Sequence, residues 1–184
     1  NLHWYAGVDP DPTFAHVTEG AEVLRAAGCT AIVAVGGGSS MDAAKIIACT
    51  RTSDDSPDRW VGLNKVPDDV LPIYAIPTTS GTGSEATMGA VIKDPEEKLK
   101  YIIVGEDLLP QAVALDPDML LGLPAPVTAA TGIDALTHGI EAFICIWDRG
   151  TRKENGRLAI QGVFRWLERA VQHPEDVEAR QGMA

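Results

Sequence analysis

Three consecutive glycines between a buried strand and a helix constrain the fold of this chain more than any other feature. The run Ala31–Val35 is short, apolar and bounded by turn residues, which is typical of a buried strand. Gly36, Gly37 and Gly38 follow it, and a helical pattern begins at Ser39. Glycines permit close approach of a ligand, and the free N–H groups of the following helix favour a phosphate or pyrophosphate. The spacing is not GxGxxG, so an ordinary tight strand-to-helix turn stays an alternative.

Further patterns place strands and helices along the chain. Asp11 and Pro12 suit the cap and first position of a helix that Gly28 ends. Residues 51–71 are polar and rich in Asp and Pro, and we interpret them as a surface excursion. Strands are expected at residues 72–76, 87–92, 100–104 and 113–115, and helices at residues 126–146, 151–172 and 175–184.

The order of these elements indicates the fold class. Strands mixed with helices are followed, after residue 118, by helices without any strand pattern. This order predicts an α/β domain over residues 1–117 and the start of an all-α domain over residues 118–184.

A hydroxyl-rich segment, TTSGTGSE, follows the strand predicted at residues 72–76. Five hydroxyl side chains and two glycines lie within Thr78–Glu85. Such residues can line the phosphates and sugar of a nucleotide, whereas a solvated loop would have the same composition. The position after a strand favours the ligand, because open α/β sheets bind ligands at the carboxyl ends of their strands. Lys100, at the start of a later strand, is either a phosphate partner or a surface charge.

Asp134 and His138 are the residues that could hold a metal. They are four positions apart, so on a helix they share one face. One oxygen and one nitrogen ligand can bind a divalent ion such as Fe, Zn, Mn or Ni. An exposed hydrogen-bonded pair or a core histidine would give the same spacing.

Charge and cysteine content narrow the possible partners. The net charge of −11 over 184 residues argues against nucleic acid or an anionic membrane. No apolar run approaches the roughly 20 residues that span a bilayer, and no leader pattern opens the chain. Cys29, Cys49 and Cys145 are far apart, so we expect free buried thiols in a reducing compartment. A cytoplasmic protein is expected, and association of several copies stays open.

The three motifs taken together resemble the iron-containing (group III) alcohol dehydrogenase family. The resemblance rests on VGGGSSMDAAK (Val35–Lys45), IPTTSGTGSEAT (Ile76–Thr87) and LDPDMLLGLPAPVTAATGIDALTHGIEAF (Leu115–Phe143), in the family's order and spacing. It implies a Rossmann-like nucleotide-binding domain followed by a helical metal-binding domain. The implied activity is metal-dependent hydride transfer between an alcohol, or its aldehyde or ketone, and NAD(P).

The resemblance also assigns residues. The cofactor NAD(P) would contact Gly37, Gly38, Ser39, Thr78, Thr79, Thr82 and Lys100. Asp134 and His138 would be the first two ligands of Fe(II), which zinc or another divalent ion replaces in some members. No separate catalytic side chain is identified.

The chain departs from the family in length. Family members are longer and take two further histidine ligands from a later helical bundle, so the resemblance implies an internal fragment that lacks both ends. We expect this fragment to retain little metal and to have no dehydrogenase activity. A glycerol dehydrogenase-like zinc enzyme and a metal-free nucleotide-binding module stay as alternatives.

Overall fold

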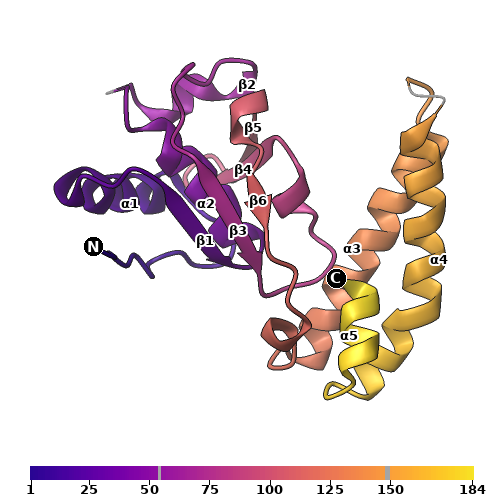
Figure 1. Ribbon diagram of the computed structural model, residues 1–184. Coiled ribbons are helices and arrows are strands. Elements are labelled where there is room, and N and C mark those ends of the chain that lie inside the picture. Colours follow the sequence, from indigo (N-terminus) through magenta and orange to yellow (C-terminus); the bar gives the residue numbers. More distant parts are fainter. Residues whose placement is uncertain (54, 148–149) are drawn as a thin grey trace. The chain divides into compact units, whose positions relative to one another are not determined.

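The strands of the described residues form two sheets of three strands each, in the orders β1-β3-β6 and β2-β5-β4 (Figure 1). In the first sheet β1 (Ile32–Gly36), β3 (Ile73–Pro77) and β6 (Ala112–Val113) are all parallel. In the second sheet β2 (Gly62–Leu63) is parallel to β5 (Leu99–Val104), and β4 (Gly89–Asp94) pairs with β5 as an antiparallel hairpin. Parallel strands combined with helices confirm the predicted α/β class.

Helix α2 (Gly38–Cys49) is the centre of the α/β part and contacts β1, β3 and β4. Small side chains such as Ala43 and Ala48 are fully buried and let the helix approach both sheets closely. Helix α1 (Phe14–Ala27) packs against it through Val17 and Leu24. The predicted strand-to-helix order around the glycines is therefore confirmed.

The interpretation of residues 51–71 as a surface excursion was wrong for Trp60 and Leu71. Trp60, in a short 3-10 helix (Pro57–Trp60), is 3% exposed, and Leu71 is 1% exposed. Both belong to the core cluster that also contains Ile46 and Ile73. Single buried residues such as these cannot be recognised in a sequence rich in Asp and Pro, because a periodic pattern needs several apolar residues at regular spacing.

Asp11 does not cap the first helix as predicted. Thr13 is the cap, since its hydroxyl accepts the His16 N–H and His16 Nδ1 accepts the Thr13 N–H. Asp11 instead has a positive φ of 60° and directs its carboxylate to Lys93 and Lys100. The Asp11 carboxylate thus forms ion pairs with a hairpin that is distant in the sequence and does not cap the helix.

Helices α3 (Ala125–Ile144), α4 (Thr151–Gln172) and α5 (Val177–Met183) follow the sheets, close to the predicted ranges. Helices α3 and α4 lie side by side (Figure 1), and α5 packs on α4. Arg180 of α5 is fully buried and donates to the Thr128 hydroxyl and to the carbonyls of Pro174 and Leu123. These bonds join α5 to the start of α3.

The structure is a computed structural model that describes residues 1–53, 55–147 and 150–184. Within them the chain forms two compact units, of which one contains Asn1–Pro77 with Ser84–Ala114 and the other Thr78–Gly83 with Leu115–Ala184. None of the helices in these residues is long and apolar enough to cross a membrane. All three cysteines are described, and none of them forms a disulfide. Only Cys49 is buried, whereas Cys29 and Cys145 are partly exposed, so the prediction of buried thiols was wrong for those two.

We expect Gly156→Ala to lower the free energy of unfolding by about 1–3 kcal/mol, because an added methyl would overpack the α3–α4 contact. Its Cβ would lie 2.7 Å from the Gly139 carbonyl oxygen and 2.9 Å from the Phe143 nitrogen. The control is Gly162→Ala in the same helix, where nothing lies within 4 Å of the added Cβ. It should raise the free energy by about 0.5–1 kcal/mol. Urea denaturation followed by circular dichroism measures both, and equal effects would contradict close packing at Gly156.

Candidate functional site

The glycine turn leaves the amino end of α2 open. Gly36 has a φ of 153°, and a Cβ there would overlap the Ser40 side chain. Gly37 is the N-cap residue with extended backbone, and no side-chain hydrogen bond caps this end among the described residues. The predicted residues Gly37, Gly38 and Ser39 thus begin a 12-residue helix whose first N–H groups can bind an anion.

The two predicted cofactor segments leave the sheet from adjacent strand ends. Gly36, at the end of β1, pairs with Pro77, at the end of β3, and Thr78 follows directly. Both segments therefore start at the carboxyl edge of the parallel sheet, which is the usual ligand edge of an open α/β sheet.

Asp11 links two other predicted cofactor residues. Its backbone N–H donates to Ser39 Oγ at 3.2 Å, and its carboxylate lies 2.7 Å from Lys100 Nζ. Lys93 Nζ, at 3.3 Å, is a second partner. Hydrogen bonds from Lys100 and then Lys93 lower the pKa of the Asp11 carboxyl group. Asp11, which was predicted to cap a helix, therefore holds Lys100 near Ser39.

The hydroxyl-rich segment contains two buried hydroxyl oxygens without a partner. Thr79 Oγ1 and Ser80 Oγ are buried and have no hydrogen bond within the described part of the chain. A buried, unsatisfied hydroxyl costs about 1–3 kcal/mol, so such groups require an explanation such as a ligand. Thr79 was a predicted cofactor residue, whereas Ser80 was not singled out, although it lies in the same motif.

Gly81 brings this segment against helix α3. It has a φ of 112°, and a Cβ there would overlap the carbonyl of Thr131. Thr131 lies three positions before Asp134 on the same helix. The segment with the predicted hydroxyls Thr78, Thr79 and Thr82 thus belongs to the same compact unit as the predicted metal pair.

The predicted metal pair is together on one exposed helix face. His138 Nε2 lies 3.8 Å from Asp134 Oδ1, and the side chains are 52% and 48% exposed. The two donors fit half of a divalent-metal shell, since a carboxylate oxygen and an imidazole nitrogen both suit Fe(II) or zinc. Among the described residues no group of three or more His, Cys, Asp or Glu side chains forms a complete shell.

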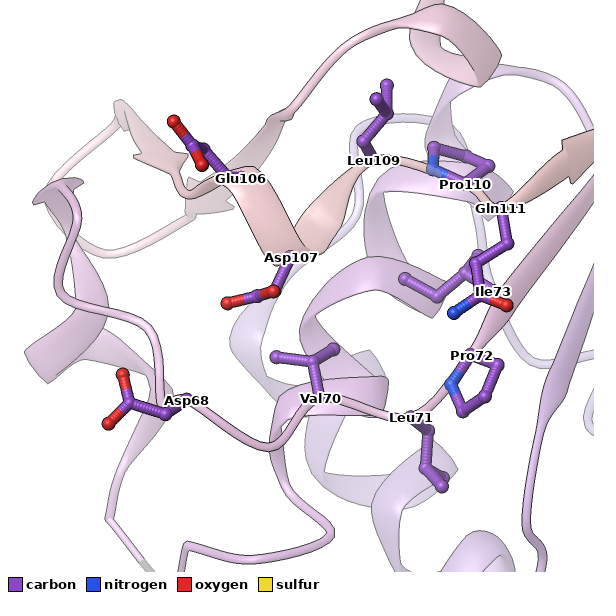
Figure 2. A pocket seen from close by; sticks show the side chains of 10 residues that line it. All are labelled: Asp68, Val70, Leu71, Pro72, Ile73, Glu106, Asp107, Leu109, Pro110 and Gln111. Atoms are coloured by element: carbon purple, nitrogen blue, oxygen red, sulfur yellow. The ribbon is translucent and has the colours of Figure 1, made fainter.

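A pocket of about 410 Å³ lies at the opposite edge of the first sheet (Figure 2). Its walls include Pro72 and Ile73 at the start of β3, and Gln111 just before β6. Asp68 and Asp107 are among the acidic side chains at its rim. None of the predicted site residues lines it, so it is separate from the cofactor edge.

Comparison with known proteins finds similar dehydrogenases among curated proteins. The chain is 40% identical over 178 residues to an NAD-dependent methanol dehydrogenase of Bacillus methanolicus, covering 95% of this chain and 46% of that protein. It is 38% identical to a 1,3-propanediol dehydrogenase of Citrobacter freundii, covering 98% of this chain and 46% of that protein. The chain therefore spans about half the length of these relatives.

A solved structure gives the same result for the fold. The sulfoacetaldehyde reductase of Bifidobacterium kashiwanohense, in complex with NAD⁺, superposes with a TM-score of 0.92 at 36% identity, over 97% of this chain and 48% of that one. The α/β region followed by helices is thus shared with a larger reductase.

Two family models match successive parts of the chain. Residues 1–117 match the model of iron-containing alcohol dehydrogenase, and residues 128–184 match the C-terminal model of the Fe-containing alcohol dehydrogenase family. The chain therefore belongs to the iron-containing alcohol dehydrogenase family.

Proposed function

We propose that this chain provides the cofactor site and half of the metal shell of an enzyme that transfers hydride between a small alcohol, or its aldehyde or ketone, and NAD(P). The observation that carries the proposal is the segment around Thr79 and Ser80. Its buried hydroxyls have no partner in the described residues, and Gly81 seats it on the helix that carries Asp134 and His138. The names of two relatives, NAD-dependent methanol dehydrogenase and 1,3-propanediol dehydrogenase, support the assignment to alcohol dehydrogenation.

The chain's own groups fit a dinucleotide. The first N–H groups of α2, which begins at Gly38 after the N-cap residue Gly37, bind the pyrophosphate. Because glycines have no side chain, nothing at this turn blocks the approach of the phosphates. Ser39 lies beside this turn and keeps its hydroxyl hydrogen to donate, because its oxygen accepts the Asp11 N–H. Lys100, oriented by Asp11, provides a cation toward the cofactor's negative charge.

The hydroxyls of Thr78, Thr79 and Thr82 orient the remainder of the cofactor. Hydroxyl groups both donate and accept hydrogen bonds, so they can pair with the donors and the acceptors of the ribose and of the amide. A bound cofactor would give Thr79 and Ser80 the partners they lack among the described residues. NAD(P) itself supplies the redox chemistry by accepting or donating the hydride.

Asp134 and His138 would hold a divalent metal, Fe(II) or in its place zinc or another ion. When bound, such an ion supplies Lewis acidity toward the substrate oxygen. The residues' part is to present one carboxylate oxygen and one neutral imidazole nitrogen from the same helix face. Two ligands hold Fe(II) weakly, since it is low in the affinity order of divalent metals. Residues 1–184 by themselves should therefore retain little metal and form no NADH from alcohol.

We expect the chain to bind NADH, measured by fluorescence energy transfer from its tryptophans. Thr79→Val should weaken binding by about tenfold, because a hydrogen bond to the cofactor is lost. The same change should not lower the free energy of unfolding, because the Thr79 hydroxyl oxygen has no partner among the described residues. Thr18→Val is the matched control, since Thr18 Oγ1 donates to the Phe14 carbonyl on an exposed part of α1. It should leave NADH binding unchanged, and absence of any energy transfer by the unmodified chain would refute the proposed cofactor site.

We expect His138→Ala in the complete enzyme to remove the bound metal and alcohol-dependent NADH formation while NADH binding persists. The reason is that the His138 imidazole is a proposed metal ligand, whereas other residues contact the cofactor. Thr137→Ala is the control on the same helix, because its exposed hydroxyl donates to the Ile133 carbonyl. Metal analysis and initial rates measure the effects. Full metal content in the His138 variant would contradict the assignment. NADH binding by the unmodified enzyme with neither bound metal nor alcohol-dependent NADH formation would favour a metal-free nucleotide-binding module.

A further inference from the structure

Lys45 is a fully buried cation whose hydrogen bonds all go to one short stretch of chain. Its Nζ lies 2.7 Å from the Ser84 carbonyl, 2.9 Å from the Thr87 carbonyl and 2.7 Å from the Gly89 carbonyl. The hydroxyls of Ser84 and Thr87 lie at 3.2 and 3.3 Å. Three carbonyls converging on one ammonium fix the path of residues 84–89, because each bond is charge-assisted and shielded from water.

Asp42, one turn earlier on α2, holds the same stretch. Its Oδ1 accepts the Ser84 hydroxyl at 2.6 Å, and its Oδ2 accepts the Val91 N–H at 3.0 Å. The carboxylate also acts on Lys45 electrostatically. Two side chains of one helix therefore hold both ends of residues 84–91.

The held stretch begins at Ser84, near the end of the hydroxyl-rich segment Thr78–Glu85. Ser84 follows Gly83 directly, and α2 starts at the glycine turn. One helix thus carries the proposed pyrophosphate site at its amino end and, two turns later, the ammonium that fixes the end of the second cofactor segment.

We propose that Lys45 is a positioning residue for the cofactor site: its ammonium fixes Ser84, Thr87 and Gly89 and so sets where the hydroxyl-rich segment ends. This inference rests on the proposed function. Lys45 does not touch the cofactor in this assignment, because its side chain has 0% exposure and five protein oxygens surround its three N–H donors.

The ammonium is the form present at neutral pH. Burial lowers the pKa of Lys45 to about 8, and the nearby carboxylates Asp42 and Glu85 oppose this decrease. At pH 7 the side chain therefore keeps its charge and its three N–H donors.

The test compares Lys45→Met with the unmodified protein. Methionine has a similar length but cannot donate. Amide hydrogen exchange, without cofactor, should become about tenfold faster at Thr87 and Val91. NADH should bind about tenfold more weakly. In the complete enzyme the KM for NAD⁺ should rise by a similar factor while kcat and the KM for the alcohol stay unchanged.

Lys65→Met is the matched control, because it removes the same charge from an exposed position. It should change neither amide exchange at residues 84–91 nor the NADH affinity. Weaker NADH binding by the Lys45 variant with unchanged exchange would indicate direct contact and overturn the inference. Faster exchange with unchanged NADH affinity and KM would overturn it as well, leaving a purely structural role.

Failure of the proposed function is distinguishable from these results. If the unmodified protein bound no NADH, the proposed cofactor site would be refuted. The exchange comparison would then still decide whether Lys45 holds residues 84–91.

Discussion

The α/β unit depends on one buried helix that has to begin without a side-chain cap. Helix α2 packs against strands of both sheets, and its residues from Met41 to Cys49 are buried except for Asp42. Glycines at its start let the chain turn sharply from β1, and the same feature leaves the first N–H groups available. Because the helix cannot shift without disrupting the core, its first N–H groups are held in fixed positions, where we propose that they bind an anion.

Polar groups inside this protein fall into two kinds, and the difference indicates where a ligand belongs. Lys45 and Arg180 are both fully buried, and each is surrounded by protein acceptors. Thr79 and Ser80 have buried hydroxyls with no partner in the described residues. Satisfied buried charges stabilise a chain path, whereas unsatisfied buried hydroxyls carry a desolvation cost that a ligand can relieve. The second kind occurs in the segment to which we propose that the cofactor binds.

Local patterns in the sequence predicted much of the fold. The glycine turn, the strands β4 and β5, and the three C-terminal helices each depend on neighbouring residues, so periodicity and turn residues were sufficient. Asp134 and His138 were also predictable as a pair, because four-residue spacing places two side chains on one helix face. Burial of Trp60 and the ion pairs of Asp11 were not, since they depend on partners far along the chain.

The sequence by itself determined which chemical groups are available and which helix and strand ends carry them, because those properties follow from residue type and short-range spacing. Only the tertiary structure decided which groups meet. It places Lys100 on Asp11, Lys45 on the carbonyls of residues 84–89, and the segment around Gly81 on helix α3. The physical reason is that burial and charge pairing between distant segments are decided by the packing of the whole core, which no local pattern encodes.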